Sequence, residues 1–101
     1  MPESSYFPLF LRLHGEPVLL VGGGEVAARK LQLLLRAGAR VQIVAAELGD
    51  EVGREVAAGR AEHRATRFDA AQLAGQRLAI AATDDAALNA AVAAAAERAN
   101  V

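Results

Sequence analysis

The chain has 101 residues, 53% of them hydrophobic, which suffices for one packed domain and argues against both disorder and a second domain. Eleven Lys and Arg against twelve Asp and Glu give a net charge of −1, so no basic surface for nucleic acid or an anionic membrane is expected. The absence of cysteine excludes disulfides, a thiolate nucleophile and Cys-ligated metal sites.

The amino-terminal residues lack the pattern of a signal peptide, and no apolar run approaches the roughly 20 residues that cross a bilayer. We therefore expect a soluble, unprocessed cytoplasmic protein.

The first structural signal is the apolar run at residues 9–13, which is closed by His14 and Gly15. This pattern predicts an extended segment followed by a turn.

A strand, a glycine turn and a helix are predicted next. The continuous apolar run at residues 17–21 is typical of a strand buried on both faces, and three glycines at 22–24 interrupt it. From Glu25 the apolar residues follow the period of a helix, which Gly38 is predicted to end. The residues on that helical face are Ala27, Leu31, Leu34 and Leu35.

Residues 40–44 form the next predicted strand, rich in β-branched side chains and reached by a short loop. The two strands and the helix between them make a βαβ unit. Such crossovers are right-handed and place the strands parallel, so helices should cover both faces of the sheet.

The middle of the chain has weaker signals. Leu48, Val52 and Val56 repeat every four residues and predict a second helix that Gly59 ends. Residues 63–68 are a polar strand candidate. Asp69 is placed to cap a single helical turn that runs through Leu73.

The last predicted elements are a buried strand at residues 78–82 and an alanine-rich helix at 85–98, with Asp84 or Asp85 as its N-cap. The order predicts an α/β protein, a Rossmann-like three-layer αβα domain with a parallel sheet that spans residues 1–101. The chain ends at Val101, where a further strand would begin, so we interpret it as a C-terminally truncated unit.

The glycine turn carries the clearest functional motif. Gly22, Gly24 and Ala27 satisfy the pattern G-x-G-x-x-A between a strand and a helix, with Gly23 inside the turn. In a dinucleotide site these positions make the tight turn, admit the pyrophosphate and let helix and strand pack closely, while N–H groups of the first helical turn face the phosphates. A Walker A loop is excluded because no G-K-[ST] follows; a plain tight turn is the alternative.

An acid near the end of the second strand would complete such a site by binding a ribose hydroxyl. Ala45 and Ala46 occupy the end of the strand and Glu47 follows them, 23 residues after Gly24. A carboxylate there favours NAD over NADP, whose phosphate it would repel. The alternative is that Glu47 belongs to the first turn of the following helix, where acids are favoured.

Thr83 lies at the carboxyl end of the last predicted strand, the edge at which open parallel sheets bind ligands, and is expected beside the cofactor. Asp84 and Asp85 are explained by the start of the helix. Polar neighbours place His14 and His63 on the surface. Arg29, Lys30 and Arg36 are expected on the solvated face of the first helix, and neither a catalytic triad nor a metal-ligand set can be assembled.

These residues resemble the amino-terminal dinucleotide-binding domain of siroheme synthase and the related precorrin-2 dehydrogenases. The resemblance rests on GGGxVAxRK within residues 18–30 and AATDDxxLN within residues 78–89. Further matches are Phe7-Pro8-Leu9-Phe10-Leu11, Leu33-Leu34 and Ala37-Gly38-Ala39, so the resemblance covers nearly the whole chain.

The resemblance implies NAD as cofactor and oxidation of precorrin-2 to sirohydrochlorin, with insertion of ferrous iron by many members of the family. It implies NAD contacts at Gly22, Gly24, Glu25 and Val26 in the turn, and at Ala46 and Glu47 after the second strand. It also implies a homodimer for the complete protein.

The family's catalytic aspartate lies in an N-V-V-D segment beyond Val101, so no catalytic residue is assigned in this chain. The dimerisation domain and the methyltransferase domain of fused members also lie outside it. The fragment alone is expected to bind NAD without catalysis. The alternative functions are an NAD-sensing module and an interaction domain whose glycine turn is empty.

Overall fold

The computed structural model describes residues 12–101, so most of the extended segment predicted at 9–13 lies outside the described residues. No helix within 12–101 is long and apolar enough to cross a membrane. The elements in chain order are β1 (Pro17–Val21), α1 (Glu25–Arg36), β2 (Arg40–Val44), α2 (Asp50–Ala57), β3 (Glu62–Ala65), the 3-10 helix η1 (Ala70–Leu73), β4 (Leu78–Ala81) and α3 (Ala86–Ala99).

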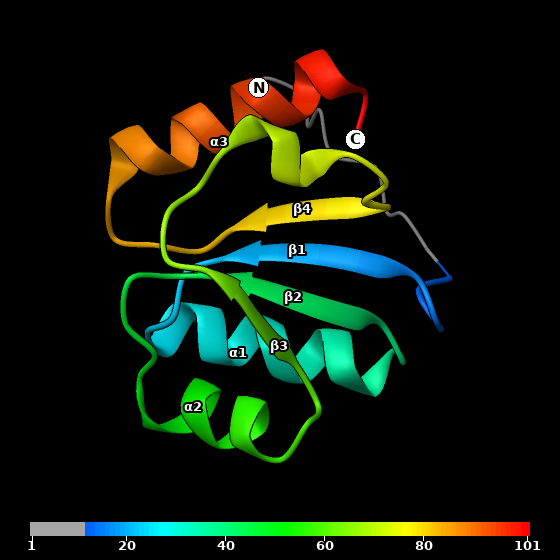
Figure 1. Cartoon of the computed structure of the whole chain (residues 1–101), viewed down its shortest axis with the longest axis vertical. Helices are drawn as coiled ribbons and strands as arrows, with labels where there is room; N and C mark the ends of the chain where they lie inside the picture. Colours follow the sequence, from blue (N-terminus) through cyan, green and yellow to red (C-terminus); the bar gives the residue numbers. More distant parts are fainter. Residues whose placement is uncertain (1–11) are drawn as a thin grey trace, which may run out of the picture.

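The four strands form one parallel sheet in the order β3-β2-β1-β4. Helices α1 and α2 cover one face of the sheet, and η1 and α3 cover the other (Figure 1). The predicted three-layer, Rossmann-like architecture is confirmed. In the register of the central strands Val21 pairs with Val44 and with Ala81, so the carboxyl ends of β1, β2 and β4 lie at the same edge.

Strand β1 explains why its sequence is apolar throughout. Val18 and Leu20 belong to the hydrophobic core under α1 and α2, whereas Leu19 and Val21 belong to the core under η1 and α3. At most 2% of each of these side chains is exposed. A strand buried on both faces cannot alternate between apolar and polar residues, so the prediction from the uninterrupted run is confirmed.

Two predicted elements have a boundary that is wrong by more than one residue, while β4 and α3 differ from their predicted ranges by one residue. Helix α2 begins at Asp50 with Gly49 as its N-cap, not at Leu48, whose half-buried side chain packs on the core from the preceding loop. The apolar repeat therefore included a residue that is not helical. Strand β3 lies at 62–65 instead of 63–68, because Thr66, Arg67 and Phe68 leave the sheet at its carboxyl edge.

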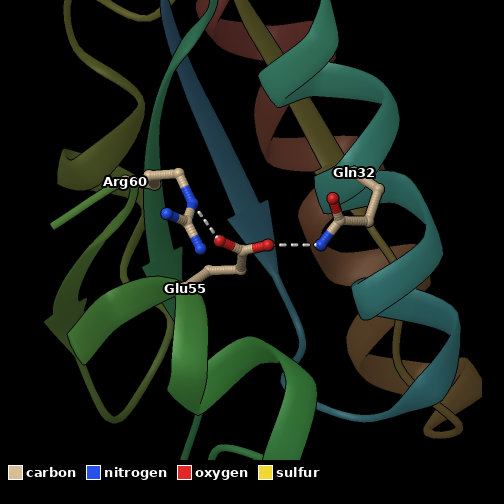
Figure 2. A network of polar contacts seen from close by, with 3 residues as sticks. All are labelled: Gln32, Glu55 and Arg60. Carbon is tan, nitrogen blue, oxygen red and sulfur yellow. Dashed lines mark hydrogen bonds and ion pairs between the residues drawn. The ribbon is translucent and has the colours of Figure 1, made fainter. Parts of the chain in front are cut away.

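Helices α1 and α2 are joined by a part-buried polar contact (Figure 2). The carboxylate of Glu55, in a residue only 9% exposed, accepts a hydrogen bond of 2.5 Å from Gln32 Nε2 and another from Arg60 Nε. The hydrogen bond from Gln32 lowers the pKa of Glu55 below its ordinary value of 4.5, and Arg60 lowers it further. The bond from Gln32 links α1 to α2 on their face of the sheet.

We expect the Glu55 contact to make the fold sensitive to acid. The folded pKa lies below the unfolded one, so the stabilisation is present above about pH 4.5 and is lost as the pH falls through the folded value. Urea unfolding of wild type and Glu55→Gln between about pH 7 and about pH 3 should show a smaller acid-induced loss in the variant. Glu51→Gln, an exposed position on α2, is the control. An equal acid-induced loss in the free energy of unfolding for wild type and Glu55→Gln would contradict the expectation.

Candidate functional site

Gly22, the first residue after β1, can be only glycine. Its φ is +136°, and a Cβ added to it would collide with the backbone carbonyl of Ala82 at the end of β4. Its N–H donates to the carbonyl of Val44 at 2.9 Å. The turn therefore leaves β1 through a narrow passage between the ends of β2 and β4, as the first position of the motif requires.

Gly23 fastens the turn to the loop between β2 and α2. Its carbonyl accepts a hydrogen bond of 2.8 Å from Gly49 N–H, and a Cβ added to it would collide with the carbonyl of Glu47. The glycine turn and the β2–α2 loop thus form one unit. Their close approach explains why glycine also occupies the middle position of the turn.

Gly24 differs from the two glycines before it, because a Cβ added there would meet nothing within 4 Å. It is the N-cap of α1, and no side chain accepts a hydrogen bond from the first turn of this helix. By contrast, the Asp85 side chain caps α3 by accepting from Leu88 N–H at 3.0 Å. The first N–H groups of α1 are therefore available to an anion, and no Cβ covers them.

A cleft of about 820 Å³ lies over the carboxyl ends of the strands, next to this helix terminus. Three segments beyond the glycine turn line it: the loop after β2, the loop after β3 and the loop after β4. All predicted cofactor-binding residues line this one cleft, namely Gly22, Gly23, Gly24, Glu25, Val26, Ala46, Glu47 and Thr83. The volume lies within the range of small-molecule sites.

Glu47 lies in the loop between β2 and α2, exposed at the cleft and three residues before the helix begins. Its alternative assignment to the first turn of α2 is therefore wrong, since Asp50 and Glu51 occupy that turn. The cofactor contact predicted for Glu47 remains a prediction, and the position at the rim of the cleft is compatible with it.

Thr83 is held by Asn89, a residue of α3. The Thr83 hydroxyl donates to Asn89 Oδ1 at 2.6 Å, and Asn89 Nδ2 donates to the carbonyl of Thr83 at 2.9 Å. Asp85 N–H in turn donates to the Thr83 hydroxyl oxygen at 3.1 Å. The structure selects Asp85 over Asp84 as the N-cap of α3, and it shows that Asn89 fixes the loop at the end of β4.

The loop after β3 is the part of the cleft that sequence reasoning missed. Thr66, Arg67 and Phe68 line the cleft, although the sequence prediction placed them inside a strand. The carboxyl ends of parallel strands meet at one edge, so a correct end for β3 would have placed these residues there. Because β3 is as polar as the loop that follows it, the sequence does not indicate where the strand ends.

The cleft is acidic apart from one arginine. Its charged lining residues are Glu25, Glu47, Arg67, Asp84 and Asp85. A phosphate in this cleft would therefore depend on backbone N–H groups at the start of α1, as the glycine motif predicts. Within residues 12–101 no group of three His, Asp or Glu residues is placed to hold a metal ion.

Five further residues that the sequence predicts on the surface lie outside the cleft. His14 and His63 are exposed, as predicted, and His63 Nε2 forms a hydrogen bond of 2.9 Å with the carbonyl of Ala45. Arg29, Lys30 and Arg36 are also exposed on α1. These side chains lie outside the cleft.

The model of a protein family described as putative NAD(P)-binding matches residues 9–101, nearly the whole chain. The chain belongs to this family. A nicotinamide dinucleotide is therefore the cofactor of this NAD(P)-binding domain.

Curated relatives of this NAD(P)-binding domain include siroheme synthases. The siroheme synthase of Chromobacterium violaceum is 55% identical over 92 residues, which are 91% of this chain and 20% of that protein. Siroheme synthase 2 of Aeromonas salmonicida is 55% identical over 87 residues, 86% of this chain and 18% of that protein. The chain thus spans about a fifth of the length of these relatives.

A solved structure with the same fold is that of SirC, a precorrin-2 dehydrogenase. It superposes with a TM-score of 0.80 at 30% sequence identity, over 87% of this chain and 44% of that chain. The likeness confirms the fold class and connects this NAD(P)-binding domain with the family that the motifs indicated.

Proposed function

We propose that the chain is the NAD-binding domain of an NAD-dependent precorrin-2 dehydrogenase. The single observation that carries the proposal is the amino terminus of α1, whose first N–H groups have no side-chain cap. Gly24, which precedes them, has no Cβ and lines the cleft, as do all the other predicted contact residues. The siroheme synthase relatives and the SirC structure support the reaction. In this assignment residues 1–101 serve as one domain of the enzyme.

The residues present fit a dinucleotide. The N–H groups after Gly24 would hold the pyrophosphate, Ala46 and Glu47 would meet the adenosine ribose, and the loop at Thr83 would meet the nicotinamide half. NAD, when bound, accepts the hydride that the dehydrogenation removes. The protein's task in this domain is to hold and orient the dinucleotide at the carboxyl edge of the sheet.

Glu47 is expected to select NAD over NADP. Glu47→Gln should reduce the ratio of NAD affinity to NADP affinity about tenfold, because it removes a charged acceptor for the 2′-hydroxyl and the repulsion of a 2′-phosphate. Dissociation constants of both nucleotides, measured by calorimetry, give the ratio. Glu51→Gln, which changes the net charge equally outside the cleft, should leave it unchanged. An unaltered ratio in Glu47→Gln would show that other residues determine the selectivity for NAD over NADP.

For the complete protein the proposal includes precorrin-2 as substrate, chelation of ferrous iron, a homodimeric state and a cytoplasmic location. The catalytic base then belongs to a part of the enzyme outside residues 12–101. No side chain of the described cleft is assigned to proton transfer, since Asp85 caps a helix and Thr83 is held by Asn89.

The proposed function is tested in two stages. Thermal unfolding of this chain with NAD should show a clear rise in Tm, because a ligand at 100 times its Kd adds about 2.7 kcal/mol to the free energy of unfolding. The complete gene product with precorrin-2 and NAD should then form NADH and sirohydrochlorin together. Nucleotide binding without turnover by the complete product would indicate an NAD-sensing module, and no binding would reject the site.

A further inference from the structure

Arg67 is the one cation among the residues that line the cleft, and the glycine motif does not account for it. It lies in the loop between β3 and η1 and is exposed. Among residues 12–101 no hydrogen bond or ion pair engages its guanidinium group. An exposed arginine at the rim of a cleft, without a side-chain partner among residues 12–101, is a candidate ligand contact.

The backbone around Arg67 is firmly held. Its carbonyl accepts a hydrogen bond of 3.0 Å from Gln72 Nε2, and Gln72 also completes a capping box with Asp69. Arg64 Nη1 donates to the carbonyl of Gln72 at 2.9 Å, and the side chain of Phe68 packs into the core beneath α3. The loop therefore presents Arg67 from a fixed position.

The strand order decides which half of the dinucleotide Arg67 would meet. The pyrophosphate site lies at the end of β1, between β2 on one side and β4 on the other. An acid after β2 marks the side of the adenosine ribose, so the base of that nucleoside extends toward the loop after β3. The nicotinamide half then lies toward β4, away from Arg67.

We propose that Arg67 is a specificity-determining residue that binds the face of the adenine ring with its guanidinium plane. The proposal rests on the proposed NAD site. A planar guanidinium stacks on aromatic rings, and Arg67 needs no other partner for this role. Glu47 and Arg67 then bracket the adenosine from two neighbouring loops, with the carboxylate at the ribose and the guanidinium at the base.

The test compares ligands that contain adenosine with one that does not. Calorimetric titration of this chain should show that Arg67→Ala weakens NAD and ADP-ribose about tenfold, in the range of stacking energies, and leaves nicotinamide mononucleotide unaffected. Arg67→Lys should not restore the affinity, because an ammonium group lacks the planar surface. Arg36→Ala, which removes an exposed positive charge from the far end of α1, should bind like wild type.

Four results would overturn the assignment to adenine. Recovery in Arg67→Lys would indicate a phosphate partner, and a loss confined to NADP would indicate the 2′-phosphate. Unchanged binding by Arg67→Ala would show that the residue has no role, while the NAD site itself stands. Failure of the wild-type chain to bind NAD and ADP-ribose would reject the site and this inference together. Unfolding curves of each variant confirm that an altered affinity does not reflect a lost fold.

Discussion

Replacing Gly22 with alanine is expected to lower the free energy of unfolding by about 2 to 6 kcal/mol. Backbone strain at a φ that side chains rarely adopt contributes about 1 to 3 kcal/mol, and the collision with the Ala82 carbonyl contributes a similar amount. For a domain of this size the Tm should fall by about 8 °C or more. Urea and thermal unfolding measure both quantities.

Gly59→Ala is the matched control for this substitution. Gly59 also has a positive φ, +79°, but a Cβ added to it meets nothing within 4 Å. Gly59→Ala should therefore lower the free energy of unfolding only by the left-handed backbone strain, about 1 to 2 kcal/mol. If Gly22→Ala and Gly59→Ala lower the free energy of unfolding equally, the close approach of β4 to the turn does not contribute to the cost of the Gly22 substitution.

Gly24→Asp is expected to abolish NAD binding while preserving the fold. The φ and ψ of Gly24 are −92° and −157°, which any residue adopts, and the space around a new Cβ is open. Aspartate is a preferred N-cap, so the stability should stay level or rise by a few tenths of a kcal/mol. Its carboxylate would occupy the N–H groups of α1 and repel the pyrophosphate, and we expect the affinity to fall at least about 100-fold.

Gly24→Asn separates the effect of helix capping from the effect of the added negative charge. Asparagine caps the helix equally well without a charge, so it should reduce NAD affinity less than aspartate does. Calorimetry with NAD and thermal unfolding without ligand are measured on both variants. Wild-type affinity in Gly24→Asp would mean that the first turn of α1 does not bind the pyrophosphate.

The central strands and the glycine turn were predictable because local sequence dictates them. The predicted ranges of β1 and β2 are identical to those in the structure, since each is an apolar or β-branched run between turn residues. The capped turn at Asp69 is equally local, because Asp69 and Gln72 satisfy each other's backbone within four residues. In such segments the nearest neighbours in sequence are also the main partners.

Features that depend on distant partners could not be predicted. Gln32 and Glu55 are 23 residues apart, and their contact exists only because α1 and α2 pack on the same face of the sheet. The bond between the Gly23 carbonyl and Gly49 N–H likewise joins two segments across the fold. Asn89 was visible as part of the AATDDxxLN motif, but its bonds to Thr83 require the turn between β4 and α3.

Strand β3 has a consequence for how copies of this chain behave together. It is the edge of the sheet next to β2, and Glu62, His63 and Arg64 are all exposed along it. Charged side chains on an edge strand oppose its pairing with the edge of another molecule, a common route to aggregation. The polar sequence that made β3 difficult to recognise thus protects this side of the sheet against intermolecular strand addition at high concentration.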